Sequence, residues 1–332
     1  MAQVLHISCL VMHRARDINM DERSGAFVEQ DADLKLRDKR NFVLTGSLVV
    51  AAIGASLLWM FYGTAKPVEL DFGTLPVFIF NGAVASAGTA LLLIVACDSY
   101  AMETRYRVMG RPEIPEVAYD FYHLGKWTTF TIMSNTLGVV YFWLSTVVAW
   151  QQCRNRSIPA SLMSATSVLW SIVLPMSFLV NLVVTFVLIP GMKKMGKFDK
   201  VWFVLKWQPQ AMHNGFVLVS AFEAVLAQPK LQLEDFPILV VYGSFYVVFS
   251  WFLFWRTGIF HYFFLDPRFK FNPCAVLGLL VLLICTYVLC YFGIQLASQH
   301  VWAKLLIMLA AIATCTFHDK DARPATVGAG EL

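Results

Sequence analysis

A few polar side chains inside long apolar stretches are the positions where this sequence could do chemistry. Thr131 supplies a hydroxyl, His213 an imidazole and Asp266 a carboxylate. Asn135 follows Thr131 by one helical turn, which places both residues on one helix face. A histidine beside a threonine hydroxyl can take its proton while the oxygen attacks a carbonyl. Polar groups inside membrane spans cost free energy, so these positions are the first candidates for function.

Simpler interpretations compete with catalysis at these positions. A threonine near a helix start commonly bonds a carbonyl one turn back, and a lone interfacial histidine is commonly a packing residue. Glu223 lies near the end of a short span, where its side chain can reach water, and we assign it no role. We interpret Asn81 and Asn181 as residues that hydrogen-bond between helices.

The elements that must position these residues are membrane-spanning helices. Of the 332 residues, 58% are hydrophobic and 14% charged, and the mean hydropathy is +0.61, which excludes an ordinary soluble domain. A hydrocarbon core about 30 Å thick needs apolar runs of roughly 17–25 residues. We predict an all-α bundle with about eight such spans, near residues 42–62, 75–97, 128–150, 164–189, 211–227, 237–256, 273–295 and 301–317.

Lysines and arginines indicate the orientation of these spans. Alternate loops collect nearly all of them, whereas the remaining loops hold only Lys66, Arg154, Arg156 and Lys230. Because cytoplasmic loops are enriched in basic residues, both termini are predicted to be cytoplasmic. The chain then divides into an N-terminal tail (1–41), a transmembrane domain (42–317) and a C-terminal tail (318–332). In this topology Thr131, His213 and Asp266 share the cytoplasmic leaflet.

Composition excludes several other classes of function. The net charge of +4 is small and its basic residues are scattered among loops, which argues against nucleic-acid binding. No two of the seven cysteines have the C-x-x-C spacing of a metal site, so we expect no metal and no cofactor. The segment from Lys193 to Gln210 mixes aromatic and basic residues, and we expect it either to lie along the membrane surface or to form a simple aromatic anchor.

The sequence resembles the androgen-induced membrane protein family, integral membrane threonine hydrolases that cleave fatty acid esters of hydroxy fatty acids. The resemblance covers about 75–295. It is carried by Trp127 with Thr131 and Tyr141-Phe142, by Leu174-Pro175, by Met212-His213, and by Thr257-Gly258 with Tyr262, Phe264, Leu265 and Asp266. Phe263 replaces a proline of the family pattern, Leu218 replaces another, and Arg256 is closer to the rolling-stone-like membrane proteins.

The resemblance implies that Thr131 is the nucleophile and His213 the base of a lipid ester hydrolase. We expect Asn135 to stabilise the oxyanion, Asp266 to orient His213, and Lys193, Lys194, Lys206 or Arg256 to attract a substrate carboxylate. The partners are then a lipid ester and membrane lipids, without a defined protein partner. The alternative is a non-enzymatic multi-pass scaffold or transporter of rolling-stone-like type. The sequence does not distinguish the endoplasmic reticulum from the plasma membrane.

Overall fold

The computed structural model describes residues 25–62, 72, 74–98, 102–106, 108 and 114–320. Long helices dominate them, as the hydropathy pattern predicts. The helices are α2 (Gly25–Tyr62), α3 (Leu75–Cys97), α4 (Phe130–Cys153), α5 (Ala160–Val183), α6 (Ile189–Lys194), α7 (Phe198–Val204), α8 (Trp207–Gln210), α9 (Phe216–Leu226), α10 (Phe236–Thr257), α11 (Asn272–Gln299) and α12 (Val301–Thr314).

Short elements connect these helices. The strands β1 (Met102–Tyr106) and β2 (Val117–Phe121) form an antiparallel hairpin that the sequence did not predict. Two π-helical turns, η2 (Val184–Leu188) and η3 (Ala211–Gly215), join α5 to α6 and α8 to α9. Three 3-10 turns complete the set: η1 (His123–Thr128), η4 (Leu233–Asp235) and η5 (Phe263–Leu265).

Six of the helical segments within the described residues are long and apolar enough to cross a membrane. They correspond to six of the predicted spans and identify a multi-pass helical bundle suited to a membrane. The predicted fifth span is divided between η3 and α9, which continue from α8, and the predicted eighth corresponds to α12, which has only 14 residues. Helix α2 starts at Gly25, well before residue 42, because the charged stretch ahead of the apolar run is also helical.

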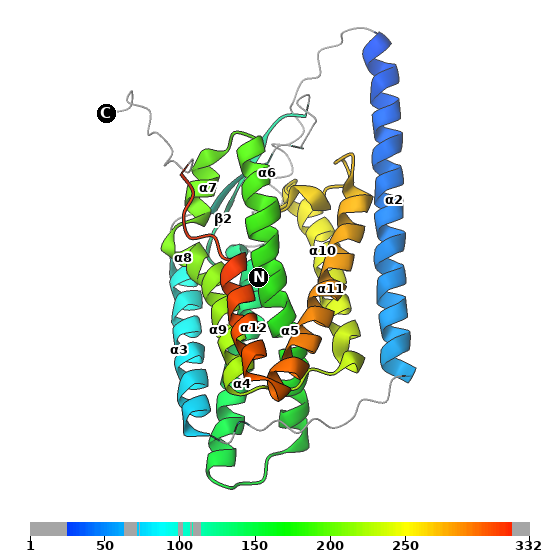
Figure 1. Cartoon of the computed structure of the whole chain (residues 1–332). Helices are drawn as coiled ribbons and strands as arrows, with labels where there is room; N and C mark the ends of the chain where they lie inside the picture. Colours follow the sequence, from blue (N-terminus) through cyan, green and yellow to red (C-terminus); the bar gives the residue numbers. More distant parts are fainter. Residues whose placement is uncertain are drawn as a thin grey trace, which may run out of the picture.

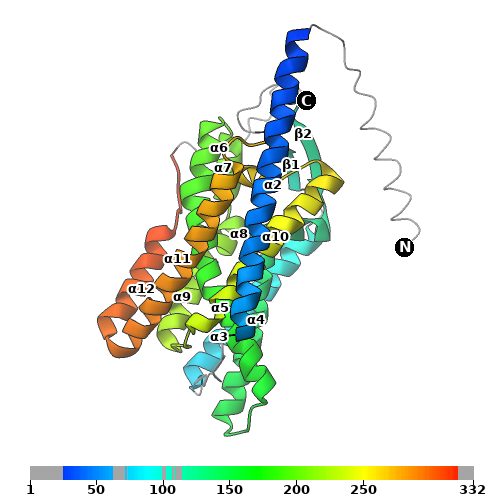
Figure 2. The ribbon, with the colours of Figure 1, turned by 90° about the vertical axis from the view of Figure 1, so that its right-hand side faces the viewer.

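Successive helices run in alternating directions between the two ends of the bundle (Figure 1). The β hairpin, α6 and α7 lie at one end, and the α4–α5 and α11–α12 connections lie at the other. The view in Figure 2 shows α2 lying along α10 and α11, with which it is in contact. We call the end with the hairpin the basic end, because Lys126, Lys193 and Arg268 belong to its loops and helix ends.

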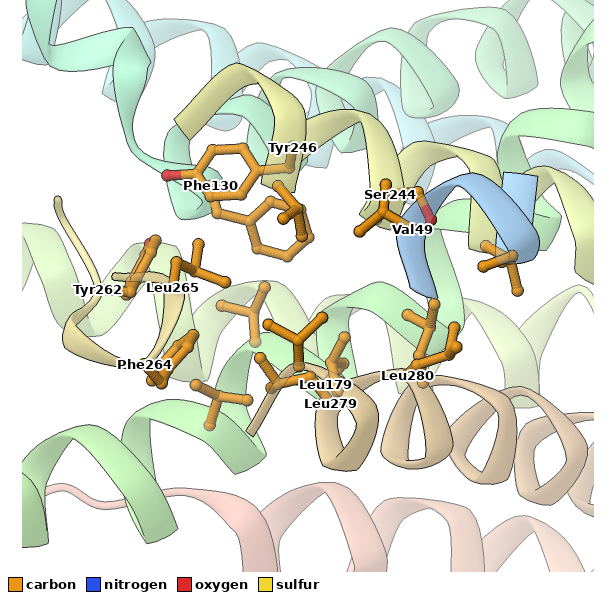
Figure 3. A pocket seen from close by; sticks show the side chains of 18 of the residues that line it. Val49, Phe130, Leu179, Ser244, Tyr246, Tyr262, Phe264, Leu265, Leu279 and Leu280 are labelled. Carbon is orange, nitrogen blue, oxygen red and sulfur yellow. The ribbon is translucent and has the colours of Figure 1, made fainter. Parts of the chain in front are cut away.

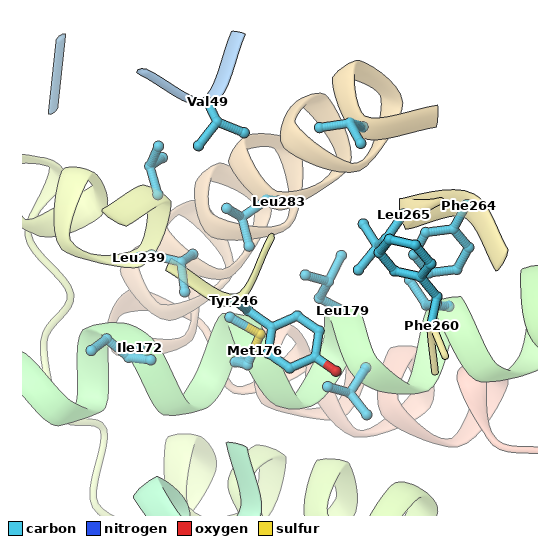
Figure 4. Close-up of a cluster of buried hydrophobic side chains, with 14 of the residues drawn as sticks. Val49, Ile172, Met176, Leu179, Leu239, Tyr246, Phe260, Phe264, Leu265 and Leu283 are labelled. Carbon is cyan, nitrogen blue, oxygen red and sulfur yellow. The ribbon is translucent and has the colours of Figure 1, made fainter. Parts of the chain in front are cut away.

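Local sequence explains where several helices begin and end. Proline occupies the first turn of α3, α10 and α11, where its missing N–H is not needed. The chain leaves α10 at Gly258, whose φ of +74° is a left-handed conformation favoured by glycine. This turn sends residues 259–265 back against the bundle, where Phe260, Phe264 and Leu265 join the largest buried apolar cluster (Figure 4).

Candidate functional site

A threonine hydroxyl and a histidine ring form a hydrogen-bonded pair at the basic end of the bundle. Thr128 is the last residue of η1, and His261 lies in the loop that follows α10. The Thr128 Oγ1 and His261 Nε2 atoms are 2.7 Å apart. This is the type of pair that the sequence predicted, but the threonine is a different residue of the same segment, and the histidine comes from the loop after α10 rather than from the segment around His213.

Neighbouring groups fix both members of the pair. The Tyr246 hydroxyl donates to the Thr128 carbonyl oxygen at 3.1 Å, and the Phe121 ring centroid lies 4.7 Å from that of His261. The Thr128 hydroxyl also lies 2.7 Å from the Gly125 carbonyl oxygen, so it can donate either to that oxygen or to the imidazole. The pair therefore links the turn before α4 to the loop after α10.

Burial determines the protonation state of His261. It lowers the pKa of the imidazole from 6.5 to about 4, because the charged form loses hydration. The ring is thus neutral near pH 7. With its proton on Nδ1, it presents Nε2 as an acceptor for the Thr128 hydroxyl. The neutral ring can therefore accept a hydroxyl proton at pH 7, although burial makes it a weaker base than an exposed histidine.

An apolar cavity of about 110 Å³ lies beside this pair. Its wall comes mainly from aliphatic side chains of α2, α5, α10 and α11, and Figure 3 shows Leu179, Leu279 and Leu280 among them. Tyr246 and Tyr262 line one end, where Figure 3 places them beside Phe130. Thr128 and His261 are not part of the lining itself. Their neighbours are: Tyr246, which hydrogen-bonds to Thr128, and Tyr262, which follows His261 in the chain. The cavity suits an acyl chain, with hydroxyl groups at one end.

Thr131 also lines this cavity, on the side of Tyr262. Burial raises the pKa of the Tyr262 hydroxyl, and the nearby Thr131 opposes that rise. No hydrogen bond joins Thr131 to His213 in the part of the chain that the structure describes. The structure therefore places the expected nucleophile at an apolar cavity but does not pair it with the expected base.

Asn135 contacts the segment that contains His213. The Asn135 amide donates to the carbonyl oxygens of Thr131, at 2.9 Å, and Met212, at 3.0 Å. Asn135 also lines a second, more open groove between α3, α4 and the α8–α9 pass, with a volume of about 660 Å³. His213 lies within η3, and its Nδ1 atom is buried without a partner. The amide proposed for an oxyanion is thus already occupied by two backbone carbonyls.

Asp266 is held away from His213 by other partners. The Arg268 side chain contacts both of its carboxylate oxygens at 2.9–3.1 Å, and the Tyr106 hydroxyl donates to Oδ2. The fully buried carboxylate thus ties the loop after α10 to strand β1. Burial and the neighbouring Asp266 raise the pKa of Tyr106, so it stays a neutral donor. The structure does not bring Asp266 to His213, since this loop packs on the hairpin.

The four cations proposed to attract a substrate carboxylate belong to the basic end but not to the cavity wall described above. Lys193 pairs with Asp319 at 2.6 Å, and Lys194 is exposed. Lys206 lies over the Trp202 ring, with its Nζ 4.4 Å from the centroid. Arg256 lies 5.5 Å from the Trp255 ring centroid. The aromatic contacts of Lys206 and Arg256 are typical of side chains anchored at a membrane interface.

Sequence reasoning assigned no role to either member of the Thr128–His261 pair, and its interpretation of Glu223 as a side chain that reaches water was wrong. Glu223 is fully buried rather than near water, and it accepts hydrogen bonds from Asn81, Tyr141 and Ser145. The interhelical role expected for Asn81 is confirmed by this contact. A carboxylate is rare in an apolar span, and this rarity was the sequence signal that could have marked Glu223 as a candidate functional residue.

Comparison with known proteins adds no family assignment. No protein-family model matches the chain, and no curated protein or solved structure shows significant similarity to it.

Proposed function

We propose that this protein is an integral membrane hydrolase of lipid esters, in which His261 activates the Thr128 hydroxyl. The observation that carries the proposal is the 2.7 Å separation of Thr128 Oγ1 and His261 Nε2. This distance lies within the range needed for direct proton transfer. The adjoining apolar cavity, with hydroxyl groups at one end, supports a substrate that has an acyl chain and a polar linkage.

The proposed reaction has two halves. The Nε2 atom of His261 takes the Thr128 proton as Oγ1 bonds to the ester carbonyl carbon. The bond to the leaving alcohol then breaks, and the imidazolium returns its proton to that alkoxide oxygen. In the second half, a water molecule gives a proton to His261 and attacks the acyl-threonine. The fatty acid leaves, and the proton returns to Thr128. The Thr131 and Tyr262 hydroxyls, on the cavity side, are the proposed donors to the developing oxyanion.

The resemblance to the androgen-induced family supports the same reaction class with a different pair, Thr131 and His213. Thr131 has the better access to the cavity, whereas Thr128 has the hydrogen-bonded base. In that version the substrate is a fatty acid ester of a hydroxy fatty acid. The two versions differ in which residues are indispensable, so mutagenesis separates them.

The test is turnover of a panel of lipid esters, including fatty acid esters of hydroxy fatty acids, by the purified protein in lipid nanodiscs. We expect Thr128→Ala and His261→Gln to lose at least about 100-fold in kcat. An exposed histidine at the same end provides the control, His123→Ala, which should retain activity. Loss only in Thr131→Ala and His213→Ala would replace the proposed pair with the other one. Equal turnover in all variants would refute hydrolysis and leave the non-enzymatic alternative.

We also propose that the chain crosses the membrane eight times with both termini cytoplasmic. The continuous helical run 207–226 and helix α12 supply the two passes beyond the six long ones, and they follow the alternation of direction. Single cysteines introduced into a cysteine-free background test this topology. A membrane-impermeant maleimide should label Ser157→Cys from the non-cytoplasmic side and Lys194→Cys from the cytoplasmic side. The opposite labelling would refute this orientation.

A further inference from the structure

The strongest unexplained feature outside this site is the carboxylate of Glu223. It projects from α9 into the contact between α3, α4 and α9, toward the end of the bundle away from the basic end. Its Oε1 atom accepts a hydrogen bond from Asn81 at 3.0 Å and longer ones, at 3.4 Å, from Tyr141 and Ser145. The side chain has no exposed surface. Glu223 is therefore not an interfacial side chain that reaches water.

Three oxygen atoms in this neighbourhood have no partner. They are Glu223 Oε2, Asn81 Oδ1 and Ser220 Oγ. The Asn81 oxygen belongs to the same amide whose nitrogen contacts Glu223, and Ser220 lies one helical turn before Glu223 on the same face of α9. Buried oxygens without donors are rare and indicate something bound between them.

The protein groups around Glu223 leave its charge uncompensated and its Oε2 atom without a partner. The ionised form leaves a buried negative charge, and no lysine or arginine within the described residues forms an ion pair with it. In the neutral form, a proton on Oε1 can be donated to the Tyr141 or Ser145 hydroxyl, but Oε2 then remains without a hydrogen bond. A water molecule would supply donors but would not neutralise the charge.

A bound cation resolves both problems at once. Oxygen atoms of carboxylate, amide and hydroxyl groups are the ligands of hard metal cations. The site holds one carboxylate, so a single positive charge gives a neutral assembly inside the membrane, whereas a divalent ion would leave excess charge. We propose that Glu223, Asn81 and Ser220 bind a monovalent metal cation, which bridges α3 and α9.

The experiment uses the full-length protein in nanodiscs, with thermal melting in sodium, potassium or N-methyl-D-glucamine chloride at equal ionic strength. The organic cation is too large for a buried site and serves as the reference. Sodium or potassium should raise the melting temperature by about 3 °C at roughly ten times the dissociation constant. The same melting temperature in all three salts would overturn the proposal.

Two variants make the result specific to this site. Glu223→Gln is nearly isosteric, removes the charge and should abolish the salt-dependent shift. Tyr141→Phe is the matched control, because Tyr141 donates to Glu223 Oε1 and contributes no unpartnered oxygen, so it should keep the shift. A shift that persists in Glu223→Gln would place the cation elsewhere and would also overturn the proposal. Binding of radioactive sodium to the two variants provides the second readout.

Discussion

Acidification should destabilise the protein through His261. The pKa of its buried imidazole is about 4 in the folded protein and 6.5 when exposed in the unfolded chain. Between these values the unfolded state binds the proton and the folded state does not, so this contribution to stability is fully present above pH 6.5 and decreases as the pH falls toward 4. From about pH 7.5 to about pH 5, the two pKa values give a loss of roughly 2 kcal/mol.

The assay is the melting temperature of the purified protein across that pH range, compared with His261→Gln. Other groups also titrate, so the informative quantity is the difference between the two proteins at each pH. The variant is expected to lose less stability on acidification by roughly 2 kcal/mol, a difference of several degrees. Parallel pH profiles for the two proteins would refute a neutral, buried His261.

Three further substitutions test other contacts. Asp266→Ala should destabilise the protein by about 3 kcal/mol in thermal melting, because Arg268 loses its buried partner, and an equal melting temperature would contradict this. Gly138→Ala places a Cβ 2.4 Å from a ring carbon of Phe216 and should lower the free energy of unfolding by about 2 kcal/mol. The double variant Gly138→Ala/Phe216→Leu should recover this stability in the same melting assay. Lys126→Met removes the ammonium that contacts the C-terminal carbonyls of α3 and should cost about 1 kcal/mol, with faster hydrogen exchange confined to the last turn of that helix.

The long helices were predictable because their cause is local. Hydropathy located six spans within a few residues, and proline and glycine mark several helix ends. The interruption of the fifth predicted span by the π turn η3 was harder to predict from the sequence. Pro209 sits just ahead of η3, but whether a proline yields a kink, a π turn or a new helix depends on the neighbours that take up the freed backbone groups.

The sequence located the segment of the candidate hydroxyl but not that of the candidate base. The hydroxyl was expected within residues 127–131, which include Thr128, whereas the base was expected at His213 and the structure pairs Thr128 with His261 instead. Thr131 was chosen from the family resemblance, and it lies in the first turn of α4, whereas Thr128 ends a 3-10 turn just before that helix. His261 lies in an irregular loop, where periodicity carries no information about side-chain direction. Long-range packing therefore decided which hydroxyl meets which ring.

The segment after α12 contacts the π turn that contains His213, which no local pattern could reveal. The two π turns, η2 and η3, interrupt consecutive passes, and such turns widen a helix and weaken its regular hydrogen bonding. Residues 314–316 contact both of them: Thr185 in η2 donates to the Thr314 carbonyl oxygen at 2.7 Å, and Asn214 in η3 donates to that of Thr316 at 3.1 Å. Residues 314–316 thus connect the two π turns and hold the backbone next to His213. Its unpartnered Nδ1 is consequently held in place by its neighbours rather than by a hydrogen bond of its own.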